Sequence, residues 1–262
     1  MNAFRQALWA EMLKARRAKI TWLAAAATLL LPLVDGLFMV ILKDPVRAQS
    51  MGLISTKAQL AAGLADWPTF ISVLLQGMGI AGSILFAIFT AWVFGREFSD
   101  HTAKEWLSLP TGRGTIVAAK FCLIFIWGLA LSLLIYAVGL GIGQVVEIPA
   151  GSPGLVWTSF GRLLAIALLT YLLMPVVAWF ASVGRGYLPP LGWAFLAMAL
   201  GQIAAVLGWG DWFPWSVPAL LSSMAGSPQD LLGFHSYLVV LLVFVAGIAA
   251  TLAWWNYADQ SQ

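Results

Sequence analysis

Long apolar stretches alternate with shorter polar segments along the chain, and this alternation is the clearest pattern in the sequence. Each apolar stretch has about 20 residues or more, which is enough for a helix to cross a hydrocarbon core of ~30 Å. The pattern predicts an all-α integral membrane protein whose transmembrane domain covers residues 20–257, followed by a short tail at 258–262. The six predicted transmembrane helices are residues 20–42, 70–94, 117–146, 158–183, 190–208 and 237–257.

Composition supports a membrane protein over a soluble one. Of 262 residues, 61% are hydrophobic and 10% are charged, against about 25% charged in a typical soluble domain. The formal net charge is +3, but the basic residues flank the apolar stretches, where membrane orientation and anionic lipid explain them better than nucleic acid does. We therefore expect contact with membrane lipid and no binding of nucleic acid.

The basic residues are distributed unequally between the two sides of the predicted membrane domain. Ten of the fourteen flank the spans on one side, and this side is expected to be cytoplasmic because Lys and Arg are retained there. Six spans then place both the N- and C-termini in the cytoplasm, in a multi-pass protein of the cell (inner, cytoplasmic) membrane. The ten residues are Arg5, Lys14, Arg16, Arg17, Lys19, Arg96, Lys104, Arg113, Lys120 and Arg185.

Residues 1–19 predict a basic amphipathic helix ahead of the first span. Its apolar positions share one face at 3.6 residues per turn, whereas Glu11 and most of the basic residues lie elsewhere. Such a helix lies in the plane of the inner membrane surface. Two roles fit it equally: an anchor that orients the first span, or an in-plane element that passes force from a cytoplasmic partner to that span. The apolar face consists of Phe4, Leu8, Trp9, Met12 and Leu13.

An aromatic segment at 209–236 precedes the last span on the external side. Three tryptophans and two prolines lie within residues 209–218. Tryptophan favours the level of the lipid headgroups. We expect this segment to lie in the interface or to dip into the membrane as a short re-entrant helical pair, which requires that protein cover its backbone.

The cytoplasmic loop at 95–116 combines charged residues with an apolar ridge. Asp100 or Thr102 can cap a helix of about two turns, and a proline and a glycine end it before the third span. A short helix of this kind suits a groove in a soluble partner, whereas the alternative is a solvated loop whose charges only fix the topology. The residues expected to form or stabilise the element are Glu97, Asp100, Thr102, Leu107, Pro110 and Arg113.

The same loop resembles permeases of the ABC-2 type, the membrane subunits of ATP-binding-cassette exporters. The resemblance rests on Glu97-x-x-Asp100-x-Thr102 followed by Leu107, Pro110, Arg113 and Lys120. The opening run Trp9-Ala10-Glu11-x-x-Lys14-x-x-Arg17 is similar to the usual start of the family. The run Phe213-Pro214-Trp215-Ser216-Val217-Pro218 is similar to one in its lantibiotic-immunity and bacitracin-resistance branch. His101 stands where many members have glycine.

This resemblance implies a division of labour between subunits. The first cytoplasmic loop would form a coupling helix that docks into a separate ATPase (nucleotide-binding) subunit, with the N-terminal helix beside it. The transporter would contain two permease chains, identical or homologous, and two ATPase subunits. ATP would be bound by the partner, so this chain itself needs no cofactor.

No motif in the sequence supports an enzymatic reaction. A phosphate-binding loop is absent, as are the H-E-x-x-H and G-x-S-x-G patterns. His101 and His235 fall on opposite sides of the predicted membrane domain, and Cys122 is the one cysteine. We therefore expect neither catalytic residues nor a metal site.

A few polar residues within the spans are candidates for the transport pathway, since such positions are costly unless functional. They are Asp35, Gln76 and Gln202. Asp35 could line the pathway, pair with Arg162, or extend outward to the interface. The glutamines are equally compatible with hydrogen bonds between helices.

The sequence thus predicts the permease of an ABC exporter for a hydrophobic or amphipathic substrate, such as an antimicrobial peptide, a drug or a lipid-like molecule. The alternative is a secondary transporter or a membrane scaffold that works without an ATPase.

Overall fold

The computed structural model describes residues 3–44, 49, 52, 64–100, 112–149, 151–223 and 232–257. All regular secondary structure in these residues is helical. In chain order the main elements are α1 (Ala3–Arg17), α2 (Lys19–Lys43), α5 (Trp67–Gly77), η1 (Met78–Gly82), α6 (Ser83–Ser99), α8 (Arg113–Val145), α9 (Pro153–Val183), α10 (Leu188–Val206), η2 (Pro214–Ser216), α11 (Val217–Ser223) and α12 (Phe234–Tyr257).

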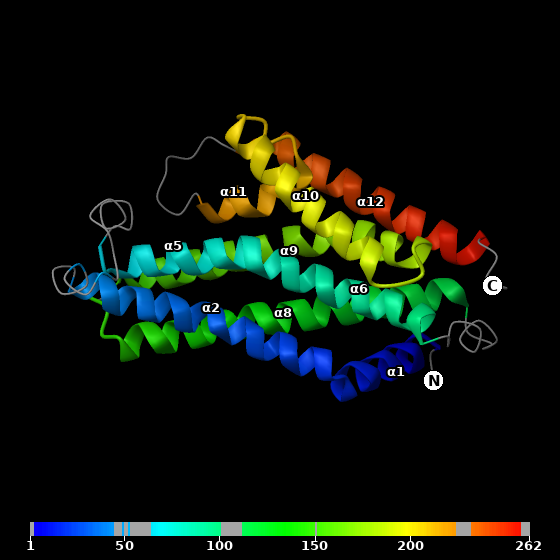
Figure 1. Ribbon diagram of the computed structural model, residues 1–262, viewed down its shortest axis with the longest axis horizontal. Helices are drawn as coiled ribbons and strands as arrows, with labels where there is room; N and C mark the ends of the chain where they lie inside the picture. Colours follow the sequence, from blue (N-terminus) through cyan, green and yellow to red (C-terminus); the bar gives the residue numbers. More distant parts are fainter. Residues whose placement is uncertain are drawn as a thin grey trace.

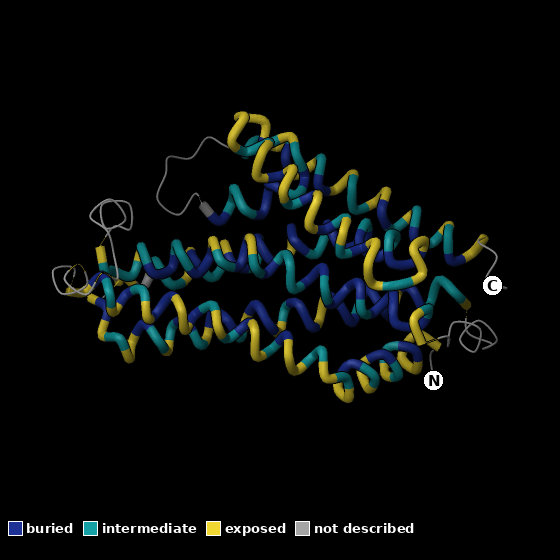
Figure 2. Tube along the Cα trace, in the orientation of Figure 1, coloured by how far each residue is buried: buried dark blue, intermediate teal, exposed yellow. Residues whose placement is uncertain are grey.

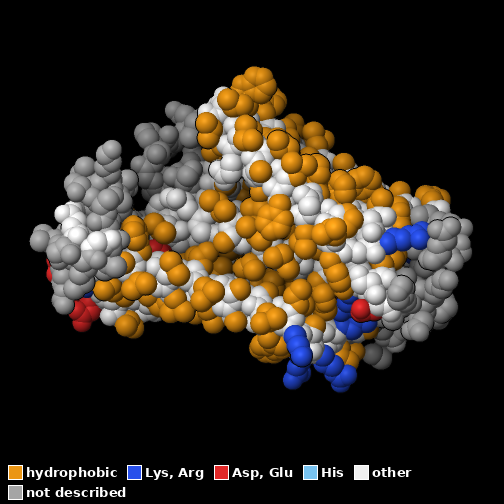
Figure 3. All heavy atoms as spheres, viewed as in Figure 1, with side chains coloured by type: hydrophobic (Ala, Val, Ile, Leu, Met, Phe, Trp, Pro, Cys, Tyr) orange, Lys and Arg blue, Asp and Glu red, His pale blue; other side chains and the backbone are white. Residues whose placement is uncertain are grey.

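Six helices in the described part of the chain are long and apolar enough to cross a membrane, as predicted. They are α2, the continuous unit Trp67–Ser99 formed by α5, η1 and α6, then α8, α9, α10 and α12. Their surface is apolar: Figure 3 shows hydrophobic side chains over most of the visible face, with most of the visible Lys and Arg beside α1. The chain is a multi-pass membrane protein.

The second and third spans begin or end beyond the bounds that the apolar pattern predicted. The second starts at Trp67, because Asp66 accepts a hydrogen bond of 2.9 Å from the Thr69 N–H and so caps the helix. It continues through Gly95 and Glu97 to Ser99, and Asp100 is its C-cap residue. The third span starts at Arg113, immediately after Gly112. The predicted loop at 95–116 is therefore helical at both of its ends.

The helix α9 lies at the centre of the bundle and packs against α6, α8, α10, α11 and α12. The helices α2 and α8 pack together on one side, and α10 and α12 lie on the other (Figure 1). Buried residues concentrate along the inner faces of α6, α8 and α9 (Figure 2). Both termini lie at the same end of the bundle.

The described part of the aromatic segment folds back onto the bundle as η2 and α11. The helix α11 packs against α5, η1 and α9. Its contact with the π-helical turn η1 is close, since a Cβ added to Gly79 would lie 2.8 Å from Ser222 Oγ. Gly79 is about 18 Å along the span from Trp67, at 1.5 Å per residue. The helix α11 thus lies well inside the length of the neighbouring spans.

Candidate functional site

The helices α1, α6 and α8 meet at the end of the bundle that carries both termini. The helix α6 ends and α8 begins on either side of residues 101–111, which lie outside the described residues. Ala18, in an extended conformation, separates α1 from α2, and α1 packs against α8. Of the predicted coupling residues, Glu97, Asp100 and Arg113 lie at the ends of α6 and α8 that meet here.

Five charged side chains meet at the junction, and we call them the ion cluster: Glu11 and Lys14 from α1, Arg96 and Glu97 from α6, and Lys120 from α8. Lys120 Nζ lies 2.8 Å from Glu97 Oε1 and 3.4 Å from Glu11 Oε2. Arg96 Nη2 lies 2.8 Å from the same Glu11 oxygen. Lys14 Nζ lies 3.0 Å from Glu11 Oε1 and 3.3 Å from Glu97 Oε1. Each carboxylate therefore contacts cations from more than one helix.

Four of the five residues of the ion cluster are buried, and Lys14 is partly exposed. Glu11 and Lys120 are 0% exposed and Glu97 is 1% exposed. Ions that lose their hydration must be paired with good geometry, and here the backbone also contributes, because Lys120 donates a 3.0 Å hydrogen bond to the Val93 carbonyl. The Arg96 guanidinium lies 4.5 Å above the Trp92 ring, a cation–π contact. The cluster thus joins three helices to one another, although Glu97 Oε2 has no hydrogen-bond partner among the described residues.

Two opposing effects set the protonation of the α1 residues. Burial by itself raises the pKa of Glu11, but attraction to Lys120, Arg96 and Lys14 is stronger in sum and holds this pKa below its usual value of 4.5. Burial lowers the pKa of Lys14, and Glu11 partly offsets that effect. Glu11 is therefore ionised throughout the neutral range and attracts the surrounding cations.

The other predicted coupling residues have different surroundings. Asp100 is exposed and is the C-cap residue of α6. Arg113 lies outside the ion cluster and donates hydrogen bonds to the carbonyls of Trp255 (2.9 Å) and Asn256 (3.3 Å), at the end of α12. Thr102, Leu107 and Pro110 lie outside the described residues, as does the predicted short helix.

The sequence pattern places Glu11 on the polar side of an amphipathic helix and so does not identify it as a site residue. The face of α1 that packs on the bundle consists of Ala7, Glu11 and Ala15. Most of the predicted apolar face points outward instead, with Trp9 69% exposed, whereas Leu8 packs against the core. A lone acid between two alanines at i−4 and i+4 was the available signal, since small residues allow close helix packing.

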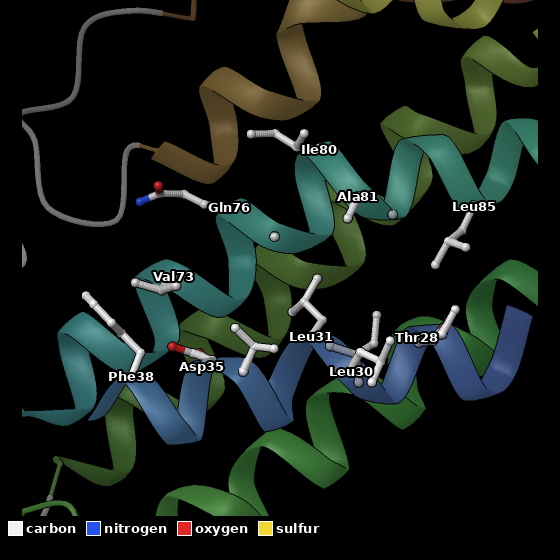
Figure 4. Close-up of a pocket in the computed structure, with 15 residues that line it drawn as sticks. Thr28, Leu30, Leu31, Asp35, Phe38, Val73, Gln76, Ile80, Ala81 and Leu85 are labelled. Carbon is white, nitrogen blue, oxygen red and sulfur yellow. The ribbon is translucent and has the colours of Figure 1, made fainter. Parts of the chain in front are cut away.

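The predicted pathway residues do not form one group. Asp35 and Gln76 line the same groove between α2 and the Trp67–Ser99 span (Figure 4). Gln202 is exposed on α10 and is not among the residues that line it. Asp35 is 3% exposed and neither of its oxygens has a hydrogen-bond partner among the described residues. Asp35 therefore does not pair with Arg162, which is exposed on α9, and its side chain does not extend outward to the interface.

At the opposite end, His235 Nε2 lies 2.9 Å from Asp211 Oδ2, and its ring stacks on Trp212 with centroids 4.4 Å apart. This contact joins the start of α12 to the turn before η2. Within the part of the chain that the structure describes, no group of His, Cys, Asp and Glu could hold a metal ion.

Comparison with known proteins bears on the function of this arrangement. Residues 7–201 match the sequence model of the ABC-2 family transporter protein. The chain is also 23% identical over 192 residues to the bacitracin transport permease protein BCRB of Bacillus licheniformis, which covers 73% of this chain and 91% of the relative. The family match begins at Ala7 in α1 and extends into α10, so it includes all five residues of the ion cluster.

Proposed function

Because this chain belongs to the ABC-2 family of transporter proteins, we propose that it is the permease of an ABC exporter and that a separate ATPase subunit docks at the ion-cluster end. The permease is a transport subunit without a catalytic domain, and its family implies an ATPase partner. Two permease chains, identical or homologous, would form the pathway between them. ATP would be bound by the partner only.

The ion cluster is the observation that carries this proposal. It joins α6 to α8 through Glu97 and Lys120, and it joins α1 to both through Glu11. The segment 101–111 is thus held between two helix ends that are fixed to each other. A displacement of this segment by a partner would move the ends of α1, α6 and α8 together, as a rigid body.

The distribution of basic residues supports a cytoplasmic position for the ion-cluster end of the bundle. Arg5, Arg16 and Arg17 are exposed on α1 at the same end as both termini. Exposed Lys and Arg next to spans favour the cytoplasmic side, where an ATPase has access to ATP. The outward apolar face of α1, with Trp9, would lie on the inner membrane surface as an in-plane helix.

The cargo we propose is hydrophobic or amphipathic: an antimicrobial peptide, a drug or a lipid-like molecule. Support comes from the largely apolar lining of the groove beside Asp35. The printed name of the Bacillus licheniformis relative gives bacitracin as what that protein transports.

The test is co-purification of an ATPase subunit from native membranes in mild detergent, identified by mass spectrometry and by ATP hydrolysis. Asp100→Lys reverses an exposed charge beside 101–111 without touching the buried cluster, and Leu107→Asp removes an apolar position of the segment itself. Asp44→Lys, at the opposite end of the bundle, is the matched control. We expect the ATPase with the wild type and the control, and reduced recovery with the other two variants. A wild-type protein that elutes without any ATPase would contradict the proposal and favour a secondary transporter or a scaffold.

A further inference from the structure

A groove of about 680 Å³ lies between α2 and the facing span formed by α5, η1 and α6. This volume is within the range of ligand sites for drug-sized molecules, roughly 300–1,000 Å³. Figure 4 shows Thr28, Leu31 and Asp35 on the side of α2 that faces the other span, with Ala81 and Leu85 opposite. The lining is apolar apart from a few positions.

Asp35 is the charged residue of this lining. The residue is 3% exposed, and both of its carboxyl oxygens lack a hydrogen-bond partner in the described part of the chain. Gln76 does not hydrogen-bond to Asp35. Its amide donates to Ser72 Oγ at 3.0 Å and is directed away from Asp35 in Figure 4. An isolated carboxylate in an apolar setting is costly and marks a functional position.

The π-helical turn η1 forms part of the groove wall across from α2, where Leu31 faces its start at Gly77. Gly77, Ile80, Ala81 and Gly82 from this turn and its start line the groove. A π-helical turn inserts an extra residue into the helix and is frequently found at functional sites. Here α11 packs against the turn η1. The wall is therefore a built feature of the fold.

The chemistry of the groove selects the class of ligand. A metal ion would require several oxygen ligands to replace its hydration shell, and the described residues contain no group of His, Cys, Asp and Glu that could hold one. A single carboxylate with a long apolar lining complements a molecule that carries one positive charge on an apolar body.

We propose that this groove binds an organic amphipathic cation, with the cationic group against Asp35 and the apolar body along α2 and η1. The proposal rests on the function proposed above, for which it names the class of cargo. The carboxylate selects the charge, and the apolar walls provide affinity in proportion to the surface they cover.

The experiment uses the purified permease alone, in nanodiscs of phosphatidylcholine, without ATP. Rhodamine 6G, a permanent cation with an apolar body, is titrated and its anisotropy gives a Kd; neutral Nile red is titrated in parallel. Asp35→Asn keeps the shape and removes the charge. Glu147→Gln makes the same charge change at an exposed site outside the groove. Ala81→Leu reduces the volume of the groove. Size-exclusion elution and thermal midpoints show that each variant is folded.

We expect Asp35→Asn to raise the Kd of rhodamine 6G by about tenfold or more, because it removes the charge-assisted contact, and to leave Nile red unchanged. Ala81→Leu should weaken both dyes, and Glu147→Gln neither. Equal rhodamine 6G affinities for wild type and Asp35→Asn overturn the proposal, as does a wild type that binds no rhodamine 6G. Since no ATPase is present, these results are independent of whether an ATPase co-purifies.

Discussion

Lys120 Nζ and Glu97 Oε1 lie 2.8 Å apart, with both side chains buried, and they connect the two helices that flank residues 101–111. A buried ion pair of this kind is weak evidence for stability, because its attraction must offset the lost hydration of both ions. Its clearer consequence is geometric. The ends of α6 and α8 have a fixed separation, and α1 is attached to both through Glu11.

Removal of Lys120 should be strongly destabilising. Lys120→Met keeps the length of the side chain but leaves Glu11 and Glu97 buried near one another with one cation fewer. Breaking a buried pair in this way costs about 3–5 kcal/mol. The thermal midpoint in detergent, followed by tryptophan fluorescence, measures the loss.

Arg17→Met, on the exposed side of α1, is the control for Lys120→Met and should change stability by no more than about 0.5 kcal/mol. The double variant Lys120→Met/Glu97→Gln should recover part of the loss, since the uncompensated carboxylate is removed as well. Equal midpoints for Lys120→Met and Arg17→Met would show that the ion cluster does not hold these helices together.

Neutralisation of Glu11 should release α1 from the bundle. Glu11→Gln removes the partner that Lys14, Arg96 and Lys120 share and leaves these cations to repel one another around Glu97. We expect faster trypsin cleavage at Arg16 and Arg17 and faster hydrogen exchange across Ala3–Arg17. Gln6→Glu, which adds a charge at an exposed position of the same helix, should leave both rates close to those of the wild type.

The contribution of Glu11 should depend on pH in a defined window. Its pKa in the folded protein is lower than the usual 4.5 because the attraction of three neighbouring cations exceeds the effect of burial. A lowered carboxylate pKa gives stability that is fully present above the unfolded pKa and is lost as the pH falls through the folded one. The midpoint difference between wild type and Glu11→Gln should be constant above about pH 5 and decrease below about pH 4.5. A difference that widens on acidification would reverse this assignment.

Close packing of α9 and α12 should make Gly247 intolerant of a side chain. A Cβ at this position would lie 2.9 Å from the backbone nitrogen of Val176 and 2.9 Å from Pro175 Cβ, and Thr251 Oγ1 donates to the Pro175 carbonyl at 3.2 Å. Overpacking of this kind costs typically about 1–3 kcal/mol. Gly247→Ala should therefore lower the thermal midpoint. Gly141→Ala is the matched control, because nothing lies within 4 Å of its added Cβ, and it should be neutral or stabilising.

The predicted fold agrees with the structure more closely than the predicted site does. The six spans follow from apolar length alone, and their predicted ends differ by a few residues where a cap such as Asp66 or a breaker such as Gly112 sets the boundary. The groove beside Asp35 was not predictable from the sequence. It depends on how α2 packs against the span Trp67–Ser99, which is distant along the chain, and on a π-helical turn with no evident sequence pattern.

The sequence by itself determined the helical class, the membrane spans and the family motifs, because these depend on the length, composition and spacing of neighbouring residues. Only the tertiary structure decided which face of α1 is buried. Glu11 reaches its partners Arg96 and Lys120 across 85 and 109 residues of chain, and no local periodicity records contacts at that distance. The burial of an acid on a small-residue face is stable because three cations from three helices meet it, and that coincidence exists only in the folded bundle.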